Sequence, residues 1–291
     1  MRPSRVGGSR PKLRRIAGPR DAAFVIDPAL WVERVLGVAP DDWQAQALRA
    51  RQKEVLILMA RQGAKSTTVG WRIAHRLAFH ENSTSLVIAP TAKQSAEIVR
   101  KVMASLDQAG VPLTVRNTYG IETKVGSRVV AVPGGEDASG ARGFSVDGEL
   151  LVDEACFVDE RIIAAVRPML AVAGGTLFAV TSAGPASSWF AQRWRETEDD
   201  PAVLRITRTA YANPRIEPAF LERERRALGE ARFASEYLNT FSTPGSRWCS
   251  PDTVATLFGE PVGPEPLTYA PPNRQPAITD RDIGRLFGNA A

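Results

Sequence analysis

The residues best suited to chemistry lie in a short polar segment between an apolar run at 55–59 and a helical stretch that begins at Ser66. The segment reads Ala60-Arg-Gln-Gly-Ala-Lys-Ser-Thr67. In a strand-to-helix turn of this kind, successive backbone N–H groups and the positive end of the helix bind phosphate groups. Lys65 would then reach the β- and γ-phosphates of a nucleotide, and Ser66 would ligate Mg²⁺. The segment therefore predicts a phosphate loop.

This segment departs from the common phosphate-loop pattern GxxxxGK[ST]. Met59 stands at the first glycine position, and Ala64 stands directly before Lys65, where glycine is expected. Gly63 lies one place early, and we expect it to supply the backbone freedom instead. A methyl group at position 64 is tolerated if the local φ is negative, but it hinders phosphate binding if φ must be positive. Alone, the segment fits an ordinary strand-to-helix turn with one exposed lysine equally well.

A second chemical feature ends another apolar run, Leu150–Val152, which is followed by Asp153 and Glu154. In nucleotide hydrolases the first acid of such a pair holds the water shell of the magnesium ion, and the second orients or deprotonates the attacking water. The alternative is an aspartate that caps a helix, followed by a surface glutamate. The phosphate loop upstream favours the catalytic interpretation.

A third feature consists of Thr181, Ser182, Ala183 and Gly184, which follow the apolar run at 176–180. Hydroxyl groups at the carboxyl end of a strand beside a nucleotide can sense the γ-phosphate and pass its loss to neighbouring elements. The residue types alone also fit an ordinary polar loop, so this prediction depends on the position of the segment.

Short apolar runs alternate with longer helical stretches along most of the chain. The expected strands are 55–59, 85–89, 150–152, 176–180 and 203–207, with two or three short β segments within 112–133. The expected helices are 28–36, 42–50, 66–79, 92–106, 159–170, 187–196, 218–228 and 231–238. Continuous apolar strands separated by helices are typical of a parallel sheet covered on both faces. We therefore predict an α/β fold with a mostly parallel sheet, helices on both faces and a small helical C-terminal appendage.

The positive charge of the chain is concentrated at its N-terminus. The 291 residues include 37 basic and 32 acidic side chains, which gives a net charge of +5 and a pI near 9.5. Residues 1–20 hold seven of the basic groups and no acidic group. The remaining residues therefore hold 30 basic and 32 acidic groups. This tail could contact DNA phosphates without sequence preference, or it could be solvated or bind an acidic protein.

Composition excludes several classes of protein. Cys156 and Cys249 cannot make a disulfide framework, and the two histidines lack the spacing of zinc ligands. No apolar run approaches a membrane span, and the N-terminus lacks the continuous apolar segment of a signal peptide, so we expect a cytoplasmic protein. We divide the chain into a disordered basic tail (1–22), a phosphate-loop ATPase domain (23–212), a helical lid or linker (213–245) and a proline-rich tail (246–291).

Taken in order, these segments resemble the ATPase domain of the large terminase subunit, the DNA-packaging motor of tailed bacteriophages. The resemblance covers about residues 25–245. Trp43 and Gln44 resemble its adenine-recognising segment, Arg61–Ser66 resembles its deviant phosphate loop, and Thr181–Gly184 resembles its coupling motif. Three further stretches are similar to other parts of that domain: Ala89-Pro-Thr91 with Gln94, Ala141-Arg-Gly143 before the acidic strand, and 220–237.

The resemblance implies a P-loop NTPase of the RecA/ASCE-like kind that hydrolyses ATP with Mg²⁺ to drive packaging of double-stranded viral DNA into the procapsid. It implies metal contacts by Ser66 and Asp153 and water activation by Glu154. The implied nucleotide-binding residues are Trp43, Gln44, Arg61, Gln62, Gly63, Ala64, Lys65, Ser66 and Thr67. The implied partners are double-stranded DNA, the portal protein and the small terminase subunit in the host cell cytoplasm, with no membrane.

The family also implies a transition-state arginine, for which the chain offers two residues. Arg61 could act within its own chain, and Arg142 could reach a neighbouring subunit, an arrangement that we favour. A trans-acting arginine requires a homo-oligomeric ring.

Two alternatives to a packaging ATPase stay open. A helicase-like DNA-dependent ATPase is the nearest, because Asp153–Cys156 and Thr181–Ala183 are similar to helicase motifs. A nucleotide-binding assembly module without turnover is the other, and Ala64 motivates it. The family's C-terminal nuclease carries clustered metal-binding acids, which we do not find after residue 245, so we predict no nuclease activity in this chain.

Overall fold

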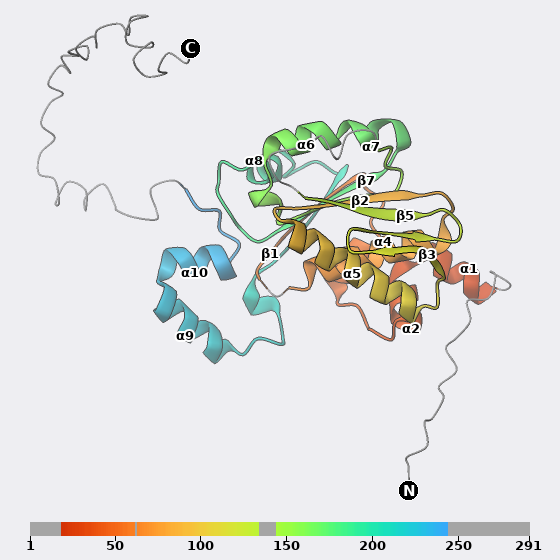
Figure 1. Cartoon of the computed structure of the whole chain (residues 1–291). Coiled ribbons are helices and arrows are strands. Elements are labelled where there is room, and N and C mark those ends of the chain that lie inside the picture. Colours follow the sequence, from red (N-terminus) through yellow and green to blue (C-terminus); the bar gives the residue numbers. More distant parts are fainter. Residues whose placement is uncertain (1–18, 62, 134–143, 244–291) are drawn as a thin grey trace, which may run out of the picture. The chain divides into compact units, whose positions relative to one another are not determined.

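The computed structural model describes residues 19–61, 63–133 and 144–243, which form an eight-stranded sheet with helices on both faces (Figure 1). The strands are β1 (Glu54–Met59), β2 (Thr84–Ala89), β3 (Leu113–Asn117), β4 (Gly120–Thr123), β5 (Arg128–Pro133), β6 (Glu149–Asp153), β7 (Thr176–Thr181) and β8 (Val203–Arg208). Their order across the sheet is β3-β4-β5-β2-β6-β7-β1-β8. All pairings from β5 to β8 are parallel, whereas β3 and β4 add an antiparallel hairpin at one edge. The predicted α/β fold with a mostly parallel sheet is confirmed.

The helices differ from the sequence-based expectation in two places. They are α1 (Pro19–Ile26), α2 (Pro28–Val35), α3 (Asp42–Leu48), α4 (Lys65–Phe79), α5 (Ala92–Gln108), α6 (Glu160–Val166), α7 (Pro168–Ala173), α8 (Trp189–Glu196), α9 (Pro218–Leu228) and α10 (Glu230–Tyr237). Helix α1 begins inside the segment 1–22 that we expected to be a disordered tail. The single helix expected at 159–170 is two helices, because Pro168 has no N–H group to continue the first one.

The two faces of the sheet alternate residue by residue. Val55 and Ile57 of β1 pack in the core beneath α2 to α5, whereas Leu56 and Leu58 pack in the core beneath α6 to α8. Every residue of β1 is buried, which explains why residues 55–59 are continuously apolar rather than alternating. Figure 1 shows these two helical layers on opposite sides of the sheet.

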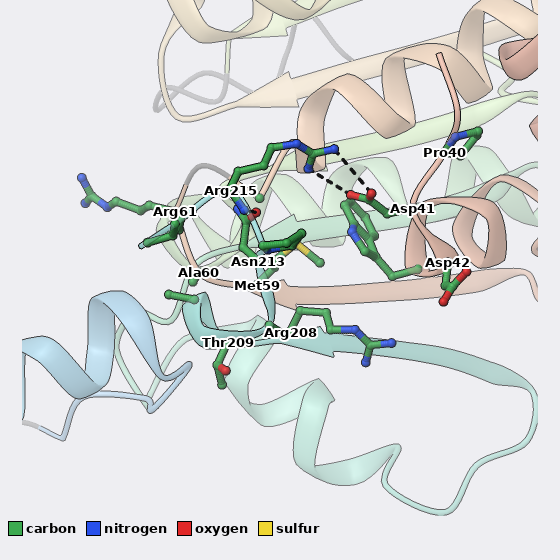
Figure 2. Close-up of a pocket in the computed structure, with 16 residues that line it drawn as sticks. Pro40, Asp41, Asp42, Met59, Ala60, Arg61, Arg208, Thr209, Asn213 and Arg215 are labelled. Atoms are coloured by element: carbon green, nitrogen blue, oxygen red, sulfur yellow. Dashed lines mark hydrogen bonds and ion pairs between the residues drawn. The ribbon is translucent and has the colours of Figure 1, made fainter. Parts of the chain in front are cut away.

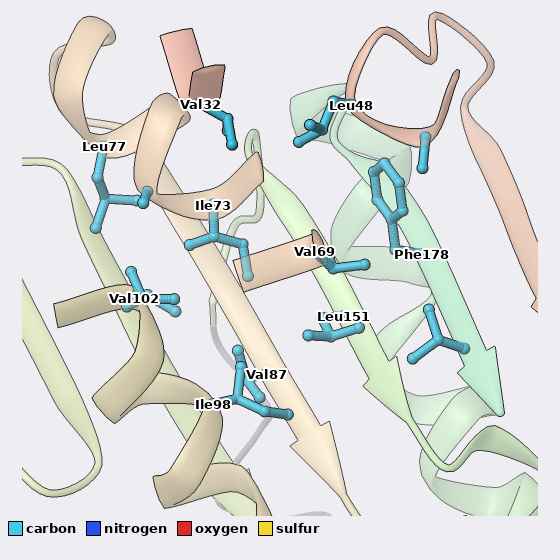
Figure 3. Close-up of a cluster of buried hydrophobic side chains, with 14 of the residues drawn as sticks. Val32, Leu48, Val69, Ile73, Leu77, Val87, Ile98, Val102, Leu151 and Phe178 are labelled. Atoms are coloured by element: carbon cyan, nitrogen blue, oxygen red, sulfur yellow. The ribbon is translucent and has the colours of Figure 1, made fainter. Parts of the chain in front are cut away.

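Helix α4 contributes four buried residues to the first core, as many as α5. Val69, Ile73 and Leu77 recur at every fourth position, so they lie on one face of the helix and point toward the sheet (Figure 3). They share this core with Val87 of β2 and Phe178 of β7. This packing fixes the direction of α4 and thereby the position of its first residues, which belong to the phosphate loop.

The strand order determines which loops meet. Strand β7 lies between β1 and β6, and all three are parallel, so the segments that follow them share one edge of the sheet. Those segments are the predicted phosphate loop, Asp153-Glu154 and Thr181–Gly184. In the C-terminal appendage, Leu221 of α9 and Phe233 of α10 are buried together with Ala60 at the start of the phosphate loop.

Two predictions about the ends of the chain concern residues outside the described ranges. They are the basic tail up to residue 18 and the proline-rich segment 246–291. Within the described ranges, no helix combines the length and the apolar character that a membrane span needs.

Candidate functional site

The carboxyl ends of β1 and β6 bring the serine of the phosphate loop against the first acid of the acidic pair. The hydroxyl of Ser66 donates a hydrogen bond of 2.8 Å to Oδ1 of Asp153, although 87 positions separate the two residues. Asp153 is 7% exposed, and burial raises its pKa to about 6, while the bond from Ser66 and the charge of Lys65 act in the opposite direction. The two oxygen-bearing side chains that the sequence predicted to contact a metal ion are therefore held together.

Lys65 directly precedes Ser66, at the first position of α4. Its ammonium group donates to the carbonyl oxygens of Met59, at 3.0 Å, and Ala60, at 3.4 Å. The residue is 7% exposed, and this burial lowers the pKa of the ammonium, while the neighbouring carboxylates of Glu154 and Asp153 raise it. Lys65 is thus a buried basic side chain within the charge field of both acids.

Glu154 is held in an unusual backbone conformation. Its φ is +46° and its ψ is +49°, in the left-handed region that non-glycine residues rarely adopt. Such conformations persist where the surrounding structure enforces them, and they concentrate at functional sites. Here Oε2 of Glu154 accepts hydrogen bonds from the hydroxyl of Ser182, at 3.2 Å, and from the backbone N–H of Ser182, at 3.4 Å.

The predicted coupling residues connect Glu154 with the C-terminal appendage. Thr181 accepts a hydrogen bond of 3.3 Å from the N–H of Cys156, and Ser182 binds Glu154. The carbonyl of Ala183 accepts from Ser235 of α10, and the carbonyl of Gly184 accepts from the N–H of Ser242 at 2.9 Å. A side chain at Gly184 would place its Cβ 2.6 Å from Cβ of Cys156. This loop therefore packs too closely for any residue but glycine at position 184.

The structure shows which of the two cases applies at position 64 of the predicted phosphate loop. Ala64 takes the left-handed conformation, with φ +58° and ψ +23°. A Cβ at position 63 would lie 2.4 Å from Sδ of Met59 and 3.2 Å from the carbonyl oxygen of Ala60. The expectation that Gly63 supplies the backbone freedom stays a prediction, because the preceding residue, Gln62, lies outside the described residues. The unfavourable case, a methyl group at a position of positive φ, is the one that the structure adopts.

The structure describes only one of the two proposed transition-state arginines, Arg61. Nε of Arg61 forms an ion pair of 2.5 Å with Oε2 of Glu236 in α10, and the Arg61 side chain is 66% exposed. Arg142 and Gln62 lie outside the described residues. The structure thus places Arg61 against the appendage and tests neither catalytic role.

Two cavities meet at the phosphate loop, and Arg61 and Gly63 line both. The larger one, of about 780 Å³, is lined by Lys65, Ser66, Thr67 and Glu154 from the predicted site. The smaller one, of about 310 Å³, lies between residues 40–43 and 208–216 and includes Trp43 (Figure 2). A ligand with a flat base and a phosphate chain could occupy both.

Gln44 does not line either cavity. Its Oε1 accepts from the N–H of Asp41 at 2.8 Å, and its Nε2 donates to Thr68 at 2.9 Å. Both ends of the amide are therefore used to hold the start of α3 against α4. The residue supports the wall that carries Trp43, which is 7% exposed.

Sequence reasoning missed the far wall of each cavity. Asn213, Arg215 and Ile216 close the smaller one, where Arg215 pairs with Asp41 at 3.2 Å (Figure 2). Gln94 and Lys101 of α5 line the larger one. No motif marks Asn213, Arg215, Ile216 or Lys101, and only the adjacency of β8 to β1 and of α5 to α4 brings them here. Gln94 belonged to a motif that we had matched without assigning it a contact.

The three-dimensional structure is similar to solved large terminases of bacteriophages. The large terminase ATPase domain of Thermus phage P74-26 aligns with 74% of this chain and 99% of its own, at 17% identity and a TM-score of 0.65. The large terminase of a thermophilic bacteriophage in complex with ADP aligns over 69% of this chain and 54% of its own, at 13% identity and a TM-score of 0.60. The HK97 bacteriophage large terminase aligns over 68% of this chain and 46% of its own, at 13% identity and a TM-score of 0.55.

Because these sequence identities are low, the similarity to the solved terminases supports a shared fold only. No protein-family model matches the sequence, and no curated protein matches it significantly. The chain has the fold of phage large terminase ATPase domains, which is of the P-loop, RecA-like kind. The resemblance first drawn from short motifs is thereby confirmed for the fold over most of the chain.

Proposed function

We propose that this chain is the ATPase module of a phage large terminase, which hydrolyses ATP with Mg²⁺ to drive double-stranded DNA into a procapsid. The observation that carries the proposal is the 2.8 Å bond between Ser66 and Asp153, with Lys65 and Glu154 lining the cavity beside it. Large terminases of the same fold have been crystallised with ADP and with ATP-gamma-S, which supports a nucleotide in this cavity.

The oxygen ligands fit a magnesium ion. Mg²⁺ prefers hard oxygen donors, and it usually takes only one or two from the protein, because waters and substrate phosphates complete its shell. The hydroxyl of Ser66 and the carboxylate of Asp153 would be those two. When bound, the ion would neutralise charge on the phosphate oxygens.

The remaining roles follow from the positions of the side chains. Lys65 holds the β- and γ-phosphates. Glu154, already held by Ser182 at the coupling loop, orients the attacking water and accepts its proton. The same bond links the presence of the γ-phosphate to α10, because Ala183 of that loop contacts Ser235. For the transition-state arginine we favour Arg142, which acts in trans within a homo-oligomeric ring. Arg61 is the alternative in cis, and it must then leave Glu236. The portal protein and the small terminase subunit complete the proposed assembly.

The test is Mg²⁺-dependent phosphate release, measured with and without duplex DNA. Glu154→Gln is expected to reduce turnover by at least about a hundredfold, which is the contribution typical of a positioned general base. Lys65→Ala is expected to reduce it by at least about a hundredfold as well, because it removes a cation that stabilises the phosphate charge. Glu160→Gln, an exposed acid at the start of α6, is the matched control and should leave turnover unchanged. Full turnover in Glu154→Gln would remove Glu154 from its role. Separation of duplex strands during turnover would favour the helicase-like ATPase instead.

One observation favours a second function, a nucleotide-binding assembly module without turnover. Ala64 has a φ of +58° at the position where close wrapping of phosphate is needed. Binding of a fluorescent ATP analogue without phosphate release, in both the natural chain and Ala64→Gly, would support the inactive module. Recovery of phosphate release in Ala64→Gly would show that the methyl group alone limits an otherwise intact site.

A further inference from the structure

A separate cavity of about 430 Å³ lies at the opposite end of the sheet, by the amino ends of the strands. It is lined by the end of α1, the turn after α3, the C-terminal half of α4 and Glu149, the first residue of β6. None of its lining residues lines the two cavities of the nucleotide site. Helix α4 reaches both regions, because it starts at Lys65 and contributes Arg72 to Arg76 here, roughly 10 to 16 Å further along its axis.

The lining of this cavity is rich in guanidinium groups. The basic residues are Arg49, Arg51, Arg72 and Arg76, and the acidic ones are Asp27 and Glu149. Two histidines also line it, and burial lowers the pKa of His75 to about 4 and also lowers that of His80, so both are neutral at pH 7. The lining therefore carries two more positive than negative charges. Asp147, which pairs with Arg76 at 3.1 Å from outside the lining, reduces the excess to one.

Three of the arginines are held in place and still have hydrogen-bond donors to spare. Arg49 binds Asp27 through Nε and Nη2, at 2.9 and 2.8 Å. Arg72 binds Glu149 through Nε at 3.0 Å and the carbonyl of Leu48 through Nη1.

Arg76, the third of them, binds Ser83 through Nε and Asp147 through Nη2. Within the described part of the chain, one terminal nitrogen of each of the three arginines has no protein partner: Nη1 of Arg49, Nη2 of Arg72 and Nη1 of Arg76. Guanidinium groups fixed in this way bind an oxyanion without a further loss of side-chain entropy.

The fourth arginine has no side-chain partner among the described residues. Arg51 is exposed at the turn before β1, and only its backbone N–H is engaged, by the side chain of Gln52 at 3.2 Å. Each of the other three has an acidic partner, so Arg51 accounts for the uncompensated charge. A planar guanidinium with all five donors available is suited to bidentate recognition of phosphate.

We propose that this cavity binds a phosphate group, carried either by the backbone of a nucleic acid or by a small phosphate ester. The excess of one to two positive charges matches the charge of a phosphate diester or monoester. The site is distinct from the nucleotide site, and its existence does not depend on ATP turnover.

The experiment uses the full chain with Lys65→Ala, which removes phosphate binding at the phosphate loop. Inorganic phosphate and pyrophosphate are titrated by calorimetry, and a short labelled DNA duplex is titrated by fluorescence anisotropy at several salt concentrations. Adding Arg51→Ala should weaken binding about tenfold, as expected for the loss of a charge-assisted hydrogen bond. Arg223→Ala, an exposed arginine of α9, is the matched control and should change nothing.

A second variant tests the cavity rather than Arg51 alone. Asp27→Asn with Arg49→Gln removes one guanidinium and its partner together, so it leaves no unpaired charge, and asparagine can still cap α2. This pair should also weaken binding, with the far-ultraviolet circular dichroism unchanged.

The two titrations distinguish the sources of the phosphate. A duplex affinity that falls in Arg51→Ala, with a salt slope smaller by about one, identifies the nucleic-acid backbone. An effect on inorganic phosphate or pyrophosphate alone identifies a small ester. The absence of binding by every probe, or equal affinities in Arg51→Ala and Arg223→Ala, overturns the proposal.

Discussion

Nε of Arg61 lies 2.5 Å from Oε2 of Glu236, so an ion pair joins the phosphate loop to helix α10. Ala60, the residue before Arg61, is buried in the same cluster as Phe233 of α10. The appendage formed by α9 and α10 therefore contacts the phosphate loop through both a charge and an apolar group. Movement of α10 would therefore move the predicted phosphate loop, and movement of that loop would move α10.

Removing the Glu236 charge should release Arg61. Because the Arg61 side chain is 66% exposed, Glu236→Gln should change the free energy of unfolding by less than about 1 kcal/mol. If Arg61 acts on the γ-phosphate in cis, turnover should rise by up to about fivefold, which is the rate equivalent of that energy. Steady-state phosphate release measures it. Glu230→Gln, which breaks the exposed pair with Arg225 in the same appendage, is the control. An unchanged turnover in Glu236→Gln would separate Arg61 from the chemical step.

Ala64→Gly should stabilise the protein. A non-glycine residue in the left-handed region costs about 1 to 2 kcal/mol, and the greater freedom of glycine in the unfolded chain offsets part of this gain. We expect the free energy of unfolding in urea to increase by about 0.5 to 1 kcal/mol. Ala104→Gly, at an exposed position inside α5, should have the opposite sign. If Ala64→Gly and Ala104→Gly lowered the free energy of unfolding equally, the positive φ of Ala64 would be contradicted.

Asn239 should stabilise the end of α10 against the sheet. Its Nδ2 donates to the carbonyls of Arg208, at 2.9 Å, and Leu58, at 3.3 Å, and its φ is +61°. Asn239→Ala loses both the donor and a residue tolerant of positive φ, so we expect a loss of about 1 to 3 kcal/mol. Asn239→Gly keeps the conformation and loses only the donor, so its cost should be smaller. A greater loss in the glycine variant than in the alanine variant would rule out a contribution from backbone strain.

His75 should make the fold sensitive to mild acid. Its ring is 4% exposed, its Nε2 lies 2.8 Å from the carbonyl oxygen of Phe24, and burial lowers its pKa from 6.5 to about 4. The unfolded chain therefore binds a proton below pH 6.5 that the folded protein does not bind until about pH 4. Stability contributed by neutral His75 is complete above pH 6.5 and is lost as the pH falls toward 4, by up to about 3 kcal/mol.

The measurement for His75 is the unfolding free energy at several pH values in this window. Asp153, whose pKa burial raises to about 6, acts in the opposite direction and gains stability on acidification. The wild-type chain is therefore compared with His75→Gln, which retains Asp153 and a donor for Phe24. The pH dependence of the two should differ by the contribution of His75, and parallel curves would show that His75 titrates normally.

The sequence alone identified the elements and the residues that end them. The continuous apolar runs at 55–59, 85–89 and 176–180 predicted buried parallel strands, because only a sheet covered on both faces buries every residue of a strand. The segments directly after the runs at 55–59 and 150–152 predicted Lys65, Ser66, Asp153 and Glu154 as site residues. The meeting of these residues follows from one rule, that parallel strands carry their carboxyl ends to the same edge.

Tertiary structure decided what no local pattern encodes. The φ of Ala64 depends on where the packing of α4 places the loop, so sequence could state only the two possible cases. Only the structure shows that the amide of Gln44 bonds to Asp41 and Thr68. Residues distant in sequence also meet in the ion pair of Arg61 with Glu236 and in the cavity of about 310 Å³ that Arg215 helps to close. The same holds for the cavity of about 430 Å³ around Arg51. Periodicity reports which face of an element is buried, but only the packed structure brings particular side chains into contact.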